Sequence, residues 1–292
     1  MNYQITHVTS YSGSSPVSVC HNQAWLKPRE LANQHCSNFE LQISPEPSIQ
    51  SKRIDCFGNS IHYFSFNKGY EVLKVIAKSC VCVSPKPETD QASPDWELVR
   101  REITTERTEE AIAANQFIYD SPRIRTNSDF AAYARLSFRP GVAILSAAID
   151  LTNRIFTEFQ FDARATTVTT PVEEVFRNRR GVCQDFAHLQ IALLRSLRLP
   201  VRYVSGYLRT IPAPGKERLV GADASHAWVS LYCGKDLGWV DLDPTNNLLP
   251  STDHITIAWG RDYSDVPPVR GVFLGGGTHS LTVTVDVEPM GD

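Results

Sequence analysis

Three residues far apart in the sequence, Cys183, His226 and Asp243, are of the types that together carry out nucleophilic catalysis. A thiolate attacks a carbonyl carbon, an imidazole moves the protons, and a carboxylate fixes the tautomer and orientation of that imidazole. Taken alone, each residue also has an ordinary structural explanation, as a core filler, a hydrogen-bonded histidine or a turn opener. The case for a site therefore depends on whether the surrounding elements bring the three together.

Cys183 opens an apolar segment that we expect to form a buried helix. Residues 180–195 read RGVCQDFAHLQIALLR, and their length and their Leu, Ala and Gln content favour a helix over a strand. At a helix N-terminus, unpaired backbone N–H groups and the positive end of the macrodipole stabilise an anion. We therefore expect a thiolate nucleophile at Cys183, whose backbone N–H is one donor to an oxyanion. His188, about 140° around this helix, is interpreted as a packing or supporting residue.

His226 and Asp243 lie in two runs of alternating apolar residues, SHAWVSLYC and GWVDLD, which we predict to be antiparallel strands. If Gly234-Lys235 is a two-residue type II′ turn, His226 pairs with Asp243 and Val229 with Val240. One face of this hairpin then carries the side chains of His226, Trp228, Asp241 and Asp243. Cross-strand Cβ atoms lie about 4.5–5.5 Å apart, so the carboxylate can orient the imidazole.

Composition and charge exclude several classes of protein. The chain has 292 residues, of which 42% are hydrophobic, enough for a large core in two parts. Its formal net charge of -3 argues against a nucleic-acid binder or a protein of anionic membranes. No stretch approaches the roughly 20 apolar residues of a membrane span, and the first residues lack a charged leader before an apolar run. The seven cysteines have no disulfide-framework spacing, so we expect reduced thiols and a cytoplasmic protein.

The remaining pattern indicates an α+β protein. Residues 1–85 are predicted to form a β-sandwich-like domain, with a hairpin turning at Gly58-Asn59 and a long strand over residues 72–83. Cys80 and Cys82 share a face of that strand and are interpreted as packing residues rather than half of a metal site. Residues 86–101 are polar and contain prolines, as linkers do. Residues 102–292 are predicted to form the catalytic domain, with helices near 105–115, 142–159 and 170–181 and a C-terminal β extension.

Several motifs in order resemble the transglutaminase-like superfamily of papain-like fold, especially bacterial members regarded as transglutaminase-like enzymes or cysteine proteases. They are GVCQDFAH, LPVRYVSGY, ASHAWV and GWVDLDPTN. The opening YQITHVTSYSGSSPV, the later LKPR and the hairpin DCFGN resemble the N-terminal β-domain of these bacterial proteins. The ending ITIAWGRDYSDVPPVRGV, with a last strand near 280–287, also fits the group.

The resemblance implies a role for each candidate residue. Cys183 is the expected nucleophile, His226 the general base and acid, and Asp243 the orienting aspartate, with Asp241 as the fallback. Gln184, Tyr207 and Trp228 are the candidates for the second oxyanion donor. Two positions depart from the family pattern without touching these residues: Arg198 stands where glycine is common and Val201 where alanine is frequent.

The expected reaction is acyl transfer from an amide, through a thioester on Cys183 and without a cofactor. Hydrolysis is slightly favoured over transamidation because water is always present and no amine-recognition feature is visible. The substrate is expected to be a peptide or protein amide, a glutamine side chain or a cell-wall-type amide. Two alternatives stay open: a catalytically inactive binding module of the same fold, and a metal site formed by Cys183, His226 and Asp243, all of which are zinc-ligand types.

Overall fold

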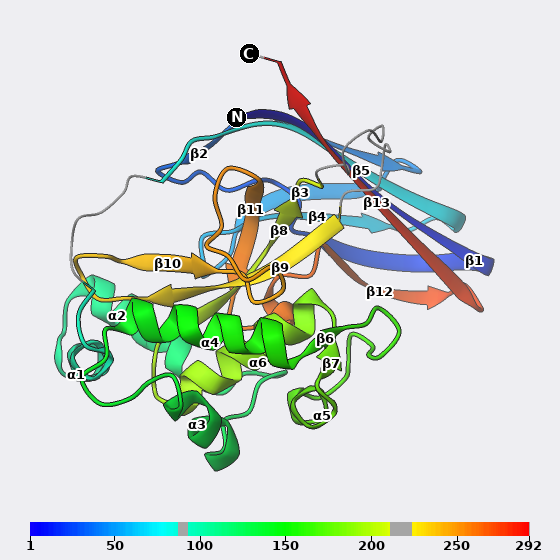
Figure 1. Ribbon diagram of the computed structural model, residues 1–292. Helices are drawn as coiled ribbons and strands as arrows, with labels where there is room; N and C mark the ends of the chain where they lie inside the picture. Colours follow the sequence, from blue (N-terminus) through cyan, green and yellow to red (C-terminus); the bar gives the residue numbers. More distant parts are fainter. Residues whose placement is uncertain (87–92, 211–223, 292) are drawn as a thin grey trace, which may run out of the picture.

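The computed structural model describes residues 1–86, 93–210 and 224–291, so positions 87–92 of the predicted linker lie outside the described residues. A large antiparallel sheet lies over a mixed layer of helices and a smaller sheet (Figure 1). The predicted α+β class is confirmed, with an N-terminal sheet followed by a mixed helix and strand core. No helix in the described ranges is long and apolar enough to cross a membrane. All seven cysteines are free thiols.

The large sheet is organised around one long strand, β1 (Asn2–Ala24). Its first half pairs with β5 (Tyr70–Val83) on one side and β13 (His279–Met290) on the other. Its second half pairs with β4 (Ser60–Phe66) and β12 (Val269–Gly275), and the register breaks between Ser12 and Val17. The outer strands are β2 (Gln34–Ser44) beside β5 and β3 (Ile49–Ile54) beside β4. The C-terminal strands therefore complete the sheet that the first residues begin.

The two halves of this sheet enclose one apolar core, which gives the predicted sandwich-like arrangement. The cluster draws its buried side chains from both halves of the sheet: Val17, Cys20, Phe64, Phe66, Leu73, Val75 and Ala77. Cys80 and Cys82 lie on the other face of β5, because side chains alternate along a strand. Their thiols are free, and Cys82 is exposed.

The hairpin between β3 and β4 differs from the predicted two-residue link. Ile54 pairs with Ser60, and the Asp55 backbone N–H donates to the Asn59 carbonyl at 3.0 Å, so three residues, 56–58, form the loop. The Asp55 carboxylate accepts the backbone N–H groups of Phe57 and Asn59, and Gly58 takes the positive φ of 78° that the turn needs. Asn59 therefore lies after the loop, and its side-chain amide donates to the carbonyl of Trp259 and accepts the Trp259 backbone N–H, in the other half of the molecule.

The helices begin earlier than composition suggested. Helix α1 (Trp96–Thr105) starts inside the segment predicted as a linker, because Trp96, Val99 and Ile103 bury one face. It is followed by α2 (Glu109–Asn115), the short η1 (Gln116–Ile118), α3 (Ser128–Arg135), α4 (Ile144–Glu158) and α5 (Val172–Asn178). Two short strands, β6 (Gln160–Phe161) and β7 (Arg180–Gly181), pair in parallel and lead into α6 (Cys183–Ser196).

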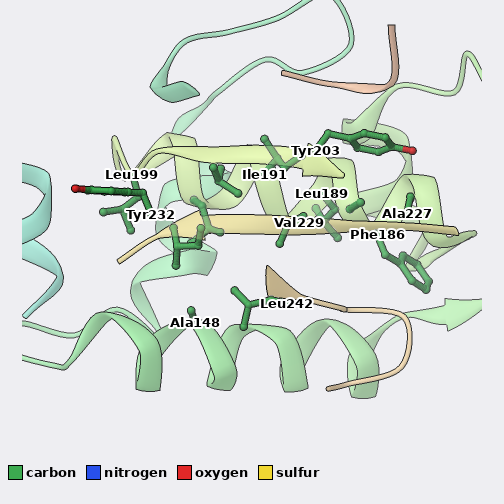
Figure 2. Packing of buried hydrophobic residues seen from close by; sticks show 14 of the residues in the cluster. Ala148, Phe186, Leu189, Ile191, Leu199, Tyr203, Ala227, Val229, Tyr232 and Leu242 are labelled. Carbon is green, nitrogen blue, oxygen red and sulfur yellow. The ribbon is translucent and has the colours of Figure 1, made fainter. Parts of the chain in front are cut away.

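Helix α6 is the centre of the second core, as its apolar sequence predicted. It packs on a four-stranded sheet of order β10-β9-β8-β11, made of β8 (Val201–Leu208), β9 (Ala224–Tyr232), β10 (Trp239–Leu242) and β11 (His254–Gly260). Side chains of α6 such as Leu189 and Ile191 meet those of β9 such as Val229, while Ala148 of α4 lies beside Leu242 (Figure 2). Burial on nearly every side holds the first turn of α6 in a fixed place.

The end of α6 explains one departure from the family pattern. Arg198 adopts a left-handed backbone with φ of 65°, and the Leu199 N–H donates to the Leu194 carbonyl at 3.1 Å. Glycine is favoured at such a position because it has no Cβ to clash. Arg198 therefore holds a conformation that suits glycine better.

Candidate active site

Cys183 is the first residue of α6, as predicted. Val182, the residue before it, has an extended backbone. The Val182 backbone N–H donates a hydrogen bond to Oδ2 of Asp185 at 2.8 Å, which satisfies one of the backbone donors that a helix start leaves unpaired. Thr166 donates to the same oxygen at 2.6 Å. A Cβ on Gly181 would lie 2.8 Å from the Cβ of Asp185, so only glycine fits there. These contacts leave the Cys183 side chain half-buried at a cleft.

The loop between β9 and β10 is longer than the predicted two-residue turn. Leu242 pairs with Val229 and Trp239 with Tyr232, and the Cys233 N–H donates to the Gly238 carbonyl at 2.8 Å. Four residues, 234–237, form the loop, so the predicted register is wrong by two positions. A shift of two leaves every side chain on its predicted face, because side chains alternate with a period of two.

His226 and Asp243 therefore meet along a diagonal rather than directly across the strands. Continued beyond β10, the observed register places Asp243 opposite Trp228. Nε2 of His226 nonetheless lies 2.7 Å from Oδ2 of Asp243, and the two residues are only 7% and 0% exposed. The pairing of this imidazole with this carboxylate thus holds in a different register.

The Asp243 carboxylate is surrounded by donors. Oδ2 also accepts Nε2 of His254 at 3.1 Å and Nδ2 of Asn246 at 2.7 Å, and Oδ1 accepts the backbone N–H of Thr245 at 2.9 Å. Burial alone would raise the pKa of Asp243, but the hydrogen bonds from His226, His254 and Asn246 outweigh it and hold that pKa well below its usual range. Asp243 is therefore a buried, fixed negative charge.

That charge acts on His226. Burial lowers the pKa of His226, but the hydrogen bonds and charges of Asp243 and Cys183 oppose it and raise the pKa to about 9. Because Nε2 is held by Asp243, Nδ1 is the ring nitrogen left for the Cys183 thiol. His226 can thus be an imidazolium near neutral pH.

Sequence reasoning missed His254. It begins β11, which pairs with β8 and not with β9, so only the sheet order brings it near His226. Room for this arrangement comes from Gly206 on β8, where a Cβ would lie 2.4 Å from the Trp228 ring. That ring stands edge-on to His254 with centroids 5.2 Å apart. No local sequence signal marks His254.

The other predicted candidates lie in varied places. The Asp241 carboxylate bonds Nζ of Lys86 at 2.8 Å and makes no bond to His226. The Tyr207 hydroxyl bonds Nδ1 of His7 at 3.0 Å in the interior, and Trp228 is fully buried. Gln184 alone of the three oxyanion candidates lines the cleft with Cys183 and His226, and its Nε2 donates to the Val168 carbonyl at 3.3 Å.

His188 has the supporting position expected of it. Its Nε2 accepts the backbone N–H of Tyr263 at 3.1 Å, and burial lowers its pKa to about 3. The ring is therefore neutral and fixes the segment after β11 against α6.

The cleft at Cys183 has a volume of about 260 Å³ and is walled by both halves of the molecule. The half built around α6 supplies Cys183, Gln184, Tyr203, Ser205, His226 and Tyr263. The large sheet supplies Thr9 and Tyr11 from β1, Val269 from β12, and Leu281 and Val283 from β13. Strands from both ends of the sequence thus form one wall of the cleft.

The residue types at His226, Asp243 and His254 also suit a metal ion, since their ligand atoms lie within 4.8 Å of one another. Both imidazole nitrogens, however, lie at hydrogen-bond distance from the same Oδ2, which sits between the rings. Zinc takes ligand nitrogens at roughly 2.0–2.1 Å, so both N–H groups would have to release that oxygen. Cys183 does not belong to this group. The arrangement fits a hydrogen-bonded network better than a metal site.

Comparison with known proteins places these features in a family. Residues 3–82 match the bacterial transglutaminase-like N-terminal region, and residues 131–244 match the transglutaminase-like superfamily. An uncharacterized protein of Mycobacterium tuberculosis is 38% identical over 295 residues, which cover 98% of this chain and 92% of that protein. A protein-glutamine gamma-glutamyltransferase of Pseudomonas aeruginosa is 28% identical over 134 residues, 46% of this chain and 20% of that protein.

The fold has a solved counterpart. The crystal structure of a proposed cysteine protease from Cytophaga hutchinsonii aligns with a TM-score of 0.79 and 21% identity, covering all of this chain and 92% of that one. At that identity the likeness concerns the fold. The matches to both regions and the full-length relative show that the chain belongs to the transglutaminase-like superfamily and carries its bacterial N-terminal region.

Proposed function

We propose that this protein transfers an acyl group from an amide through a thioester on Cys183. The observation that carries the proposal is the hydrogen bond of 2.7 Å between His226 and the buried Asp243, in a cleft that also contains Cys183 at a helix N-terminus. Family membership supports cysteine-dependent acyl transfer or proteolysis as the general activity.

The first half-reaction breaks the amide. Sγ of the Cys183 thiolate attacks the carbonyl carbon, a C–S bond forms, and the oxygen takes the negative charge. The backbone N–H of Cys183 points out of the helix start and is available to that oxyanion. His226 then gives the proton on Nδ1 to the nitrogen as the C–N bond breaks, so a neutral amine leaves and a thioester remains. Asp243 keeps Nε2 protonated throughout and orients the ring.

The second half-reaction regenerates the thiolate. His226 takes a proton from water, the oxygen attacks the thioester, and the C–S bond breaks to release a carboxylic acid. A primary amine in place of water gives a new amide by the same steps. We favour hydrolysis slightly, because water is always present and none of the cleft-lining residues forms a separate anionic site for an amine. Product analysis with and without added methylamine distinguishes the two outcomes.

The experiment that tests the proposal is the rate of alkylation of Cys183 by iodoacetamide as a function of pH. Peptide mass spectrometry resolves Cys183 from the exposed Cys56 and Cys82, which serve as internal references. We expect fast reaction of Cys183 below pH 7 in the wild type and a loss of up to about 30-fold at pH 7 and about 300-fold at pH 6 in His226→Ala, because an ordinary thiol has a pKa of about 8.5. His35→Ala, at a histidine side chain that is 72% exposed, is the matched control.

If Cys183 is unreactive in both the wild type and His226→Ala, the proposal is wrong. That result would instead favour the catalytically inactive binding module of the same fold.

A further inference from the structure

A second cavity, of about 250 Å³, opens in the large sheet, between the two halves that form the sandwich. Its lining comes from strands β1, β5, β12 and β13. Four lining residues are at most 6% exposed: Val17, Cys20, Leu73 and Asn22, whose amide donates to Sγ of Cys20 at 3.0 Å. The cavity therefore has a mainly apolar interior with one buried amide, and a rim of both apolar and polar residues.

This cavity adjoins the catalytic cleft, because Tyr11 and Leu281 line both. The two residues are direct partners in the ladder between β1 and β13, so their side chains stand on one face of the sheet. They form the boundary between the two spaces.

The same ladder runs as a continuous surface from one space to the other. Thr9 pairs with Val283, and both line the catalytic cleft. Two positions further along is the pair Tyr11 and Leu281 at the boundary. Two positions further again, Gly13 pairs with His279, and both line the second cavity. Four residues of strand span roughly 14 Å, so the surface has the length of about four residues of extended chain.

The size and chemistry of the second cavity suit an apolar group. An apolar cavity of roughly 150 Å³ takes a ligand the size of benzene. At about 250 Å³ this one has room for an aromatic ring or a branched aliphatic side chain. Tyr11 stays neutral at the boundary, since burial raises its pKa to about 12.

We propose that the second cavity is a binding subsite for an aromatic or branched aliphatic group of the amide substrate, whose chain would leave Cys183 along the stretch of β1 from Thr9 to Gly13, roughly 14 Å long. The inference rests on the proposed function of Cys183 and adds the substrate class: an amide in an extended chain with an apolar group about four residues away. The N-terminal sheet then selects the substrate as well as walling the cleft.

Alkylating probes separate this subsite from the chemistry of Cys183. Each probe is an iodoacetamide whose nitrogen carries an alkyl spacer ending in either a phenyl group or a hydroxyl group. For a spacer of roughly 14 Å we expect the phenyl probe to alkylate Cys183 about 10- to 100-fold faster than the hydroxyl probe, the factor expected for burying one apolar group. For a short spacer the two rates should be similar.

Two neighbouring residues of β12 provide matched variants. Phe273 lines the cavity, whereas Val272 does not and is 74% exposed. Phe273→Ser should reduce the long-spacer ratio of phenyl to hydroxyl rates by about tenfold, and Val272→Ser should leave it unchanged. Because Phe273 is 42% exposed, its replacement is compatible with folding, which circular dichroism checks.

The outcomes fall into separate classes. If plain iodoacetamide reacts fast with Cys183 but the phenyl and hydroxyl probes react equally, the subsite is overturned and the proposed function stands. If the phenyl probe is preferred equally in wild type and Phe273→Ser, the apolar group binds elsewhere and the subsite is overturned. If Cys183 does not react with plain iodoacetamide, both proposals fall.

Discussion

His226 and His254 hydrogen-bond to the same carboxylate oxygen, Oδ2 of Asp243, at 2.7 and 3.1 Å. An ionised carboxylate only accepts hydrogen bonds, so each ring must carry a proton on Nε2. This fixes the orientation of His226 and leaves its Nδ1 for the thiol. One buried carboxylate oxygen thus orients both rings through their Nε2 atoms.

Replacing that anion should disable the thiol. In Asp243→Asn the pKa of His226 should fall from about 9, because the negative charge beside Nε2 is lost. We expect alkylation of Cys183 at pH 7 to slow by about 10- to 30-fold, because an ordinary thiol with a pKa of about 8.5 is only about 3% ionised at that pH. Asp241→Asn is the control, since that carboxylate bonds the half-exposed Lys86 and should change the rate little. Equal rates in Asp243→Asn and wild type would exclude Asp243 from the proposed triad.

His254 is expected to be a positioning residue that acts through Asp243. His254→Leu removes one buried donor and should lower kcat about tenfold with little change in KM. Without that donor the pKa of Asp243 should rise, so the acid side of the kcat profile should move to higher pH. His254→Gln keeps a terminal N–H and should restore most of the activity. A Gln variant as slow as Leu, with no shift in the profile, would indicate a packing role alone.

Much of the site could be predicted because it depends on local pattern. The apolar run after Cys183 determined α6, and the alternation around His226 and Asp243 determined the two strands and their faces. The register was wrong because the sequence does not distinguish a two-residue turn at Gly234 from the four-residue loop that forms. The pairing survived because the error was an even number of residues.

What the sequence could not provide depends on contacts between distant segments. His254 reaches Asp243 through the order of the strands, and Gly206 makes room for the Trp228 ring beside it. Likewise, β13 pairs with β1 from Asn2 to Gly13, which brings residues near 281 to the cleft of Cys183. Such pairings at large sequence separation leave no local signal in a single sequence.

Chelation tests the metal alternative directly. If the three residues His226, Asp243 and His254 form a hydrogen-bonded network, dialysis against EDTA should leave both the Cys183 alkylation rate and the melting temperature unchanged. Metal analysis of the purified protein is the accompanying measurement. A rate that falls on chelation and returns with added zinc would favour a metal site.

The strained backbone at the end of α6 predicts a stabilising substitution. Arg198 has φ of 65°, and Arg198→Gly should raise the free energy of unfolding by roughly 1 kcal/mol, since glycine adopts this conformation without a Cβ clash. The loss of the Arg198 contact with the Tyr119 ring, 5.4 Å from its centroid, offsets part of that gain. Urea unfolding of Arg198→Gly and of Arg198→Ala measures the difference in unfolding free energy between the two variants. If glycine is no more stable than alanine, backbone strain is not the cause.

Buried neutral histidines should make the protein less stable in mild acid. Burial lowers the pKa of His188 to about 3 and that of His7 to about 4, below the unfolded value of about 6.5. As the pH falls from 6.5 to 4, the unfolded chain binds protons that the folded chain does not, so stability is lost by about 1.4 kcal/mol per pH unit for each such proton. His226, with a raised pKa of about 9, acts oppositely: its contribution is present below pH 6.5 and is lost as the pH rises towards 9.

Urea unfolding between pH 4 and 7 checks this dependence. His188→Gln keeps an acceptor for the Tyr263 N–H but does not titrate. The slope of the unfolding free energy against pH should therefore be smaller than in the wild type by about 1.4 kcal/mol per pH unit, the contribution of one proton. His35→Gln, at a histidine that is mostly exposed, should keep the wild-type slope. If His188→Gln loses stability as steeply as wild type over this range, His188 is not held neutral in the fold, and the acid sensitivity must come from other groups.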